Sequence, residues 1–461
     1  MEKNQQLTDK TTQFGEDSIL RLLTRYSLPS ILAMLAISTQ GVINMTFIGR
    51  SIGPLGIAAI AVSGPITMVQ GAISQFISNG CAAAVSITLG QGDRDGAQRI
   101  LGTSTLFLFM MAFINIAAGL FFMEPLLMAF GASEATLSLA KDYMSITLIG
   151  ASYGCISTMN PIVRIEGFPK LSMVTMLVMT CLNLILSPLF IFVFHMGIKG
   201  AALGAVTAQF GSAAWIFHFL INKKRTVRLR WKYFRLRVST ILTILKLGLP
   251  TFLMQVTQSL LSVVMNRGLL MYGGDIAISA FGITNNINNL ISQPVFGMNQ
   301  GAQPIIGYNF GAKKYDRVRQ CLVFSLIGAT IFSVLGWLLT RFFAEPIFAF
   351  FNNDPELIAV GSRMLIVFRM LIFAVGFQQA GAAYFQFSGK PLTSVFLTLS
   401  RQVLFLIPCI IILPRFFQLN GILYSGPISD FISTMLTAVF IILEFKRLKG
   451  LIRTEGMVDP L

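Results

Sequence analysis

The sequence has little charge for its length of 461 residues. Asp, Glu, Lys and Arg make up 12% of it, against about 25% of an average soluble domain, and 54% of the residues are hydrophobic. This composition excludes a water-soluble fold of this size. Lipid offers the backbone no hydrogen-bond partners, so a chain crosses it in helices of about 20 apolar residues. The composition therefore predicts an all-α integral membrane protein.

The sequence also lacks the groups that metal sites and most enzymes need. Its two histidines, His195 and His218, have no partner at metal-ligand spacing. Its five cysteines lie singly in or at the ends of apolar segments, with no C-x-x-C pair, and are interpreted as buried free thiols. No G-x-x-x-x-G-K-[ST] loop for ATP occurs. We therefore expect no enzyme, no metal and no bound cofactor.

Negative charge is scarce as well, and the formal net charge is +16. Such a charge can indicate nucleic-acid binding, but here the basic residues lie between apolar segments and form no soluble basic face. We expect no nucleic-acid partner, and a lipid bilayer as the surroundings of the chain.

What the chain does contain is a series of twelve apolar segments separated by short polar connections. They span residues 26–49, 56–89, 100–123, 137–159, 171–195, 200–221, 240–271, 276–308, 318–342, 357–386, 391–414 and 422–444. Most Lys and Arg fall in alternate connections, above all in 222–239, and in the two terminal tails. By the positive-inside rule, this pattern predicts a multi-pass protein of the cytoplasmic membrane with both termini in the cytoplasm.

The two halves of the sequence repeat at a spacing of 221 residues. Leu28-Pro29 matches Leu249-Pro250, Gly53 matches Gly274, and Gly90 matches Gly311. Six helices return a chain to its starting side, so the halves are expected to be parallel lobes related by a pseudo-two-fold axis along the membrane normal. The predicted divisions are a tail (1–25), an N-lobe (26–221), a basic cytoplasmic linker (222–239), a C-lobe (240–445) and a second tail (446–461).

Ionisable residues inside the apolar segments are rare. A charge at mid-membrane costs about 2.5 to 3.5 kcal/mol, so each one is a candidate functional residue. Asp430, Arg401 and Arg369 are the three, all in the C-lobe. They could form a structural ion pair that locks helices together. Alternatively, Asp430 could take up and release a proton or another ion, with a neighbouring arginine controlling its affinity.

Amide side chains are far more common in these segments. They could form hydrogen bonds between helices, or they could line a wet cavity between the two halves. The cavity candidates are Gln40, Gln255, Gln258, Asn266, Gln293, Gln378 and Gln379.

Four strings, together with the six-plus-six repeat, resemble the multidrug and toxic compound extrusion (MATE) family. They are LPSILAMLAISTQGVINMTFIG from residue 28, GAQPIIGYNFGAKKYDRVR from residue 301, FQFSGKP from residue 385 and GILYSGPISD from residue 421. The resemblance implies a secondary transporter that exports amphipathic, often cationic compounds in exchange for protons or sodium ions. We expect a monomer that binds a small-molecule substrate and needs no cofactor besides the coupling ion.

The sequence departs from the family at two positions of the N-lobe. Where members commonly carry aspartates, this chain has Asn44 in the first segment and Ser187 after Asn183 in the fifth. Either ion coupling has moved to the C-lobe, with Asp430 as the candidate, or Asn44 and Asn183 bind the ion through neutral oxygens. A related alternative function is a lipid-linked oligosaccharide flippase, which the two arginines of the C-lobe would suit.

Overall fold

The structure is a computed structural model that describes residues 11–351 and 354–455. These residues form helices and connections, with no strand among them. The helices of the first half are α2 (Ile19–Ser51), α3 (Pro54–Gly90), α4 (Arg94–Phe121), α5 (Met123–Ala129), α6 (Glu134–Gly154), η1 (Cys155–Met159), α7 (Asn160–Ile165), α8 (Pro169–Pro188), η2 (Leu189–Val193) and α9 (Gly197–Ile221). After η3 (Trp231–Tyr233) follow α10 (Val238–Gly311), α11 (Tyr315–Phe342), α12 (Ala344–Phe351), α13 (Pro355–Phe368), α14 (Ile372–Phe387), α15 (Pro391–Leu399), η4 (Ser400–Leu406), α16 (Ile407–Ile412), α17 (Pro414–Phe417) and α18 (Leu419–Glu455).

The all-α membrane fold predicted from the sequence is confirmed. Within the described residues, nine helices are long and apolar enough to cross a membrane, or up to eleven if two bent pairs each count as one span. The part of α10 after Gly274 is not among them. It corresponds to the predicted segment 276–308, whose many Asn and Gln residues lower its hydropathy.

Two glycines at the repeat spacing turn the chain at the same place in each half. Gly53 has φ +78° and separates α2 from α3, and Gly274 has φ +66° and breaks α10 in two. A side chain would strain this left-handed backbone, whereas glycine adopts it freely. The repeat seen in the sequence is thus also a repeat of backbone conformation.

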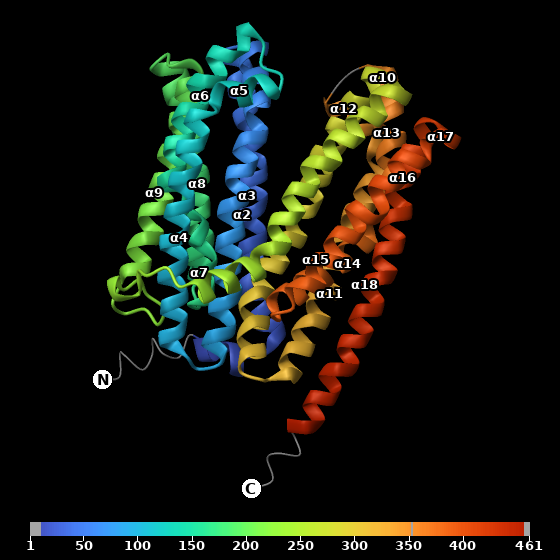
Figure 1. Cartoon of the computed structure of the whole chain (residues 1–461). Helices are drawn as coiled ribbons and strands as arrows, with labels where there is room; N and C mark the ends of the chain where they lie inside the picture. The colour runs from blue at the N-terminus through green and yellow to red at the C-terminus, as the bar shows by residue number, and fades with distance from the viewer. Residues whose placement is uncertain (1–10, 352–353, 456–461) are drawn as a thin grey trace.

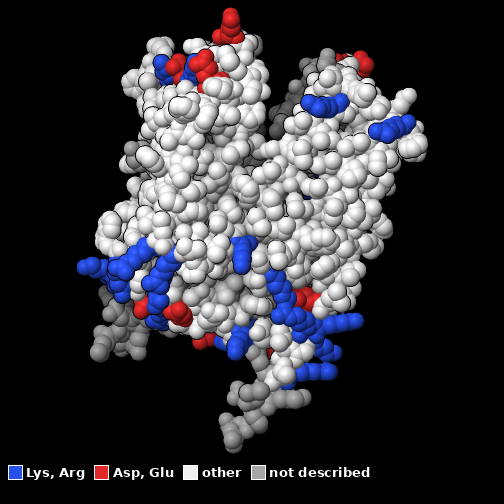
Figure 2. Space-filling view, in the orientation of Figure 1, with Lys and Arg blue, Asp and Glu red and all other residues white. Residues whose placement is uncertain are grey.

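The helices form two bundles that diverge toward one end of the molecule (Figure 1). We call α2 to α9 the first bundle and α10 to α18 the second bundle. Most of the Lys and Arg visible in Figure 2 lie at the end where the bundles meet, which we call the basic end. At the other end, Figure 2 shows a hollow between the bundles.

Close backbone contacts join the bundles near the basic end, and they are reciprocal. A methyl group added to Gly90 would lie 2.0 Å from the carbonyl oxygen of Tyr308, and one added to Gly311 would lie 2.0 Å from that of Ile87. These two contacts exchange places when 221 is added to the first partner and subtracted from the second. Glycine at both positions therefore allows α3 and α10 to touch, and closes this end.

The linker between the bundles is docked on the first bundle. Glu166 accepts hydrogen bonds from the backbone N–H groups of Thr226 (3.1 Å) and Val227 (2.6 Å), and Thr103 donates to the carbonyl of Arg235 (2.9 Å). Glu166 is only 3% exposed, and burial raises its pKa to about 7. The two N–H donors and the nearby cations Arg225 and Arg94 limit that rise.

One expectation about the cysteines is wrong. Cys81, Cys155 and Cys321 are buried and Cys409 is half-buried, but Cys181 is exposed. It lies on the outer face of α8 together with Val174 and Ile185, which are also exposed. An apolar segment in a membrane can present any apolar side chain to lipid, so an apolar context did not imply burial.

Candidate functional site

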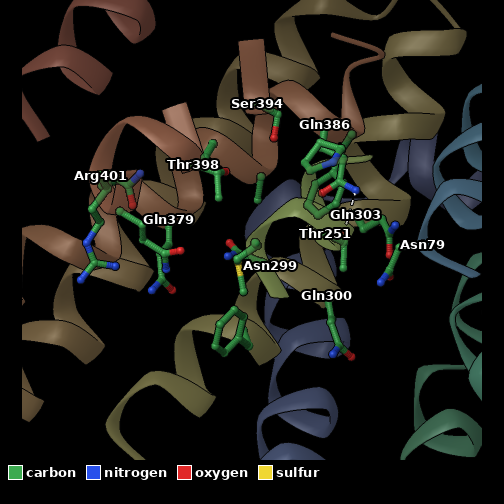
Figure 3. Close-up of a pocket in the computed structure, with 18 of the residues that line it drawn as sticks. Asn79, Thr251, Asn299, Gln300, Gln303, Gln379, Gln386, Ser394, Thr398 and Arg401 are labelled. Atoms are coloured by element: carbon green, nitrogen blue, oxygen red, sulfur yellow. Dashed lines mark hydrogen bonds between the residues drawn. The ribbon is translucent and has the colours of Figure 1, made fainter. Parts of the chain in front are cut away.

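A pocket of about 180 Å³ lies among α3, α10, α14, α15 and η4. Its lining combines amide and hydroxyl side chains with Phe, Met, Ala and Pro, and Figure 3 shows the polar groups gathered around one space. The polar lining residues are Asn79, Thr251, Gln258, Asn299, Gln300, Gln303, Gln378, Gln379, Gln386, Ser394, Thr398, Arg401 and Gln402. We call this space the central pocket.

Helical spacing explains how α14 contributes to the central pocket. Gln378, Ala382 and Gln386 recur every four residues and therefore share one face of the helix. The small side chain of Ala382 leaves room between the two amides. Gln378 donates to the carbonyl of Leu397 (3.0 Å), and Gln386 donates to that of Leu247 (2.9 Å). These bonds fix the amides while tying α14 to its neighbours.

Other amides of the pocket have unused hydrogen-bonding capacity. The buried Oε1 atoms of Gln300, Gln379 and Gln402 and the buried Nε2 of Gln303 have no partner within the described residues. Buried polar atoms are normally paired, so such atoms mark places where water or a ligand binds. Three of the four are acceptors, which suits a ligand that carries N–H or O–H donors.

A smaller cavity of about 80 Å³ lies next to the central pocket and contains the three predicted charged residues. Arg401 on η4 donates from Nε to Oδ1 of Asp430 on α18 at 2.8 Å. Arg369 lies at the 49° bend between α13 and α14, with its guanidinium 4.9 Å from the ring centre of Phe368. We call this space the charged cavity.

The charged cavity and the central pocket share part of their walls. Gln258, Arg401 and Gln402 line both. Asp430 is buried, with a side chain 3% exposed, whereas that of Arg401 is 15% exposed. Arg401 therefore connects the buried carboxylate to the larger space. The turn that carries it, Ser400–Leu406, is π-helical, a form that often occurs at functional sites.

The first bundle holds a neutral polar site instead. Asn44 on α2 donates to Oδ1 of Asn183 on α8 at 2.7 Å. A cavity of about 200 Å³ is lined by Asn44, Ser187 and Tyr143 among apolar side chains. The carbonyl oxygen of the Asn44 side chain and the hydroxyl of Ser187 are buried and unpaired within the described structure.

The structure thus places the sequence candidates in different surroundings. Gln258, Gln378, Gln379 and Arg401 line the central pocket, and Arg369, Arg401 and Asp430 line the charged cavity. Asn44 and Asn183 bond to each other. The remaining candidates lie outside the lining of the central pocket: Gln40, Gln255, Asn266 and Gln293.

Several lining residues were not among the candidates. Asn79, Thr251, Ser394, Thr398 and Gln402 are of this kind. The four-residue spacing from Gln378 to Gln386 is the one signal in the sequence that would have added a lining residue.

A second buried carboxylate on α18 has a structural explanation. Glu444 is 4% exposed, forms an ion pair with Lys390 and accepts a hydrogen bond from the Tyr384 hydroxyl at 3.0 Å. These partners come from α14 and the connection that follows it, so Glu444 fastens α18 to α14. It lies outside both cavities.

A comparison with protein families matches this architecture twice. The MatE family model covers residues 29–189 and again 250–412, once in each half of the chain. The chain belongs to the MATE family. Its members' function, multidrug efflux across a membrane, therefore applies to this multi-pass transporter.

Individual relatives agree with this assignment. The multidrug export protein MepA of Staphylococcus haemolyticus is 25% identical over 94% of this chain and 95% of its own length. A solved structure of the MATE multidrug transporter DinF-BH is 32% identical, with a TM-score of 0.87 over 93% of this chain and 96% of that one. The fold is also shared with a MATE transporter solved in an outward-facing conformation, at 20% identity and a TM-score of 0.90 over 95% of this chain and 98% of that one.

Proposed function

We propose that this MATE protein exports amphipathic organic compounds in exchange for protons or sodium ions, with Asp430 as the coupling carboxylate. The observation that carries the proposal is the Asp430–Arg401 pair, which lies where the charged cavity joins the central pocket. There, a change in the charge of Asp430 releases or captures Arg401, which itself lines the substrate pocket.

The central pocket supports binding of amphipathic compounds, including cationic ones. Apolar rings and alkyl groups would contact Phe296, Met254 and Phe387, and flexible methionine accommodates varied shapes. An ammonium group would donate to the unpaired amide oxygens. These contacts need no carboxylate in the pocket itself.

Alternating access follows from the contacts between the bundles. If the basic end faces the cytoplasm, as the positive-inside rule indicates, the described conformation is closed to the cytoplasm and open on the opposite side. Parting of the Gly90 and Gly311 contacts would open the other side. One proton that enters through 100 mV releases about 2.3 kcal/mol, which exceeds the roughly 1.4 kcal/mol needed for a tenfold substrate gradient.

The test is efflux in inverted vesicles with an imposed proton or sodium gradient. Asp430→Asn should abolish gradient-driven transport while the protein stays inserted and still binds substrate. Glu444→Gln is the matched control, since it neutralises the other buried carboxylate of α18. It should lower stability and leave coupling intact. Wild-type rate and pH dependence in Asp430→Asn would show that Asp430 is structural.

Membership of the MATE family weakens the flippase alternative. The two arginines of the charged cavity are the feature that favoured it, and they have another explanation, which follows.

A further inference from the structure

The charged cavity contains more positive than negative charge. Its titratable lining residues are Arg369, Arg401 and Asp430, and no other acidic or basic side chain of the described residues lines it. Asp430 is already engaged by Arg401 at 2.8 Å. The cavity therefore carries one cation in excess, and that cation is Arg369.

Arg369 is buried without a hydrogen-bond acceptor for its Nε. The residue is 8% exposed, and this buried atom has no partner within the described residues. The guanidinium lies instead 4.9 Å from the ring centre of Phe368. A buried guanidinium needs paired acceptors to offset the cost of losing water, and a ring face satisfies none of its five N–H donors in the plane. This unused capacity points into the cavity that Arg369 lines.

The first bundle shows that the fold does not require these charges. The residues 221 positions before Arg369 and Asp430 are Leu148, which is buried in an apolar cluster, and Gln209. The same helix positions thus pack well with neutral side chains. The charges in the second bundle serve something other than packing.

We propose that the charged cavity binds a monovalent anion between Arg369 and Arg401. The volume of about 80 Å³ has room for two or three waters, and thus for a chloride ion or one carboxylate group. The amides of Gln402, Asn285 and Asn288 line the same space and can donate further hydrogen bonds. The inference concerns binding and rests on the proposed function only for the role that the anion would have in transport.

The charge count also sets the sign of the coupling between anion and proton. Protonation of Asp430 removes the negative charge beside Arg401 and leaves two free cations. Anion and proton therefore strengthen each other's binding, and this effect is reciprocal. In an antiporter, the anion would accompany the coupling proton and would not exchange with it.

The test measures binding to purified protein in nanodiscs, in chloride-free gluconate buffer. Two probes are titrated: chloride, followed by the thermal unfolding temperature, and a fluorescent xanthene dye as the free carboxylate and as its ethyl ester, followed by fluorescence polarisation. Arg369→Leu installs the residue of the first bundle. Arg363→Leu, at an exposed arginine of the neighbouring helix α13, is the control.

We expect an anion effect in the wild type that weakens at least tenfold in Arg369→Leu and not in Arg363→Leu. Asp430→Asn should strengthen it. If chloride is the anion, chloride raises the unfolding temperature and the two dyes bind equally. If an organic carboxylate is the anion, the acid dye binds more tightly than the ester.

The proposal is overturned if neither probe distinguishes the wild type from Arg369→Leu, provided that the variant is folded. Arg369→Lys keeps the charge and should retain part of the binding, which covers the case in which Arg369→Leu unfolds. Because these measurements use no gradient, anion binding without coupled transport would contradict the proposed function alone. Coupled transport without anion binding would contradict this inference alone.

Discussion

The two bundles share a backbone plan and differ in where they carry charge. Near the basic end they are equivalent, since Gly90 and Gly311 make reciprocal contacts. At their polar sites they are not. The first bundle pairs two neutral amides, Asn44 and Asn183, whereas the second holds an ion pair and an additional arginine. A repeated fold can thus keep one symmetric surface for closure and assign charge chemistry to a single half.

The largest effect is expected where the bundles are equivalent. Gly90→Ala and Gly311→Ala each place a methyl group 2.0 Å from a backbone carbonyl, which cannot move aside cheaply. Both variants should lose transport at least tenfold, and to a similar extent, because the closed basic end becomes inaccessible. Gly71→Ala in α3 is the control, since no atom lies within 4 Å of an added Cβ there. Efflux assays check this, and a strongly unequal loss would contradict the equivalence.

The next effect separates the bundles. Arg401→Ala leaves the buried Asp430 without its partner and should lower the free energy of unfolding by about 3 kcal/mol. Thr180, 221 residues earlier, has a buried hydroxyl with no partner within the described residues, so Thr180→Ala should change stability by less than about 0.5 kcal/mol. Unfolding in detergent measures both. Equal losses would mean that the ion pair contributes no more than packing.

A pH effect of intermediate size is expected at Glu166, which has Phe387 as its counterpart in the second bundle. In the docked linker the pKa of Glu166 is raised to about 7, so docking is strongest below the ordinary carboxyl range and weakens as pH rises through 7. Between pH 5 and 8 the loss should be about 2 kcal/mol.

Hydrogen exchange at Thr226 and Val227, corrected for the intrinsic pH dependence, measures the docking of the linker. Glu166→Gln should make docking independent of pH. Protection that increases with pH in the wild type would contradict the prediction.

The smallest effect is expected in the neutral site. Asn44→Ala removes one interhelical hydrogen bond, at a cost of about 1 kcal/mol. Gradient-driven efflux should persist in this variant. If it were abolished with the protein intact, coupling would run through the neutral oxygens of the first bundle and the comparison would reverse.

The sequence predicted most of the architecture because its signals are physical requirements of the membrane. Apolar length located the helices, and the spacing of 221 residues joined Gly53 to Gly274. The pairing of Asp430 with Arg401 was also foreseeable, since few other partners exist for a charge in that region. Amides were harder to assign, because they occur on many helix faces and each can bond to a neighbouring helix.

Local changes in helical geometry and contacts between distant segments account for what was missed. The π-helical turn at Ser400–Leu406 departs from the 3.6-residue period, so the direction of Gln402 could not be counted from α15. Glu444 is buried because Lys390 and Tyr384 meet it from α14 and the connection after it. Arg369 is directed into the cavity by the bend between α13 and α14, which no single proline or glycine signal predicted.

The docked linker shortens the tether between the two bundles. Its last bond to the first bundle joins Thr103 to the carbonyl of Arg235, and α10 begins at Val238. The backbone from Arg235 to Val238 can extend about 10 Å at most. The bundles therefore stay close at this point in every conformation that keeps the linker docked. Large displacements must occur at the far end of the molecule, as in a pair of tongs held at its pivot.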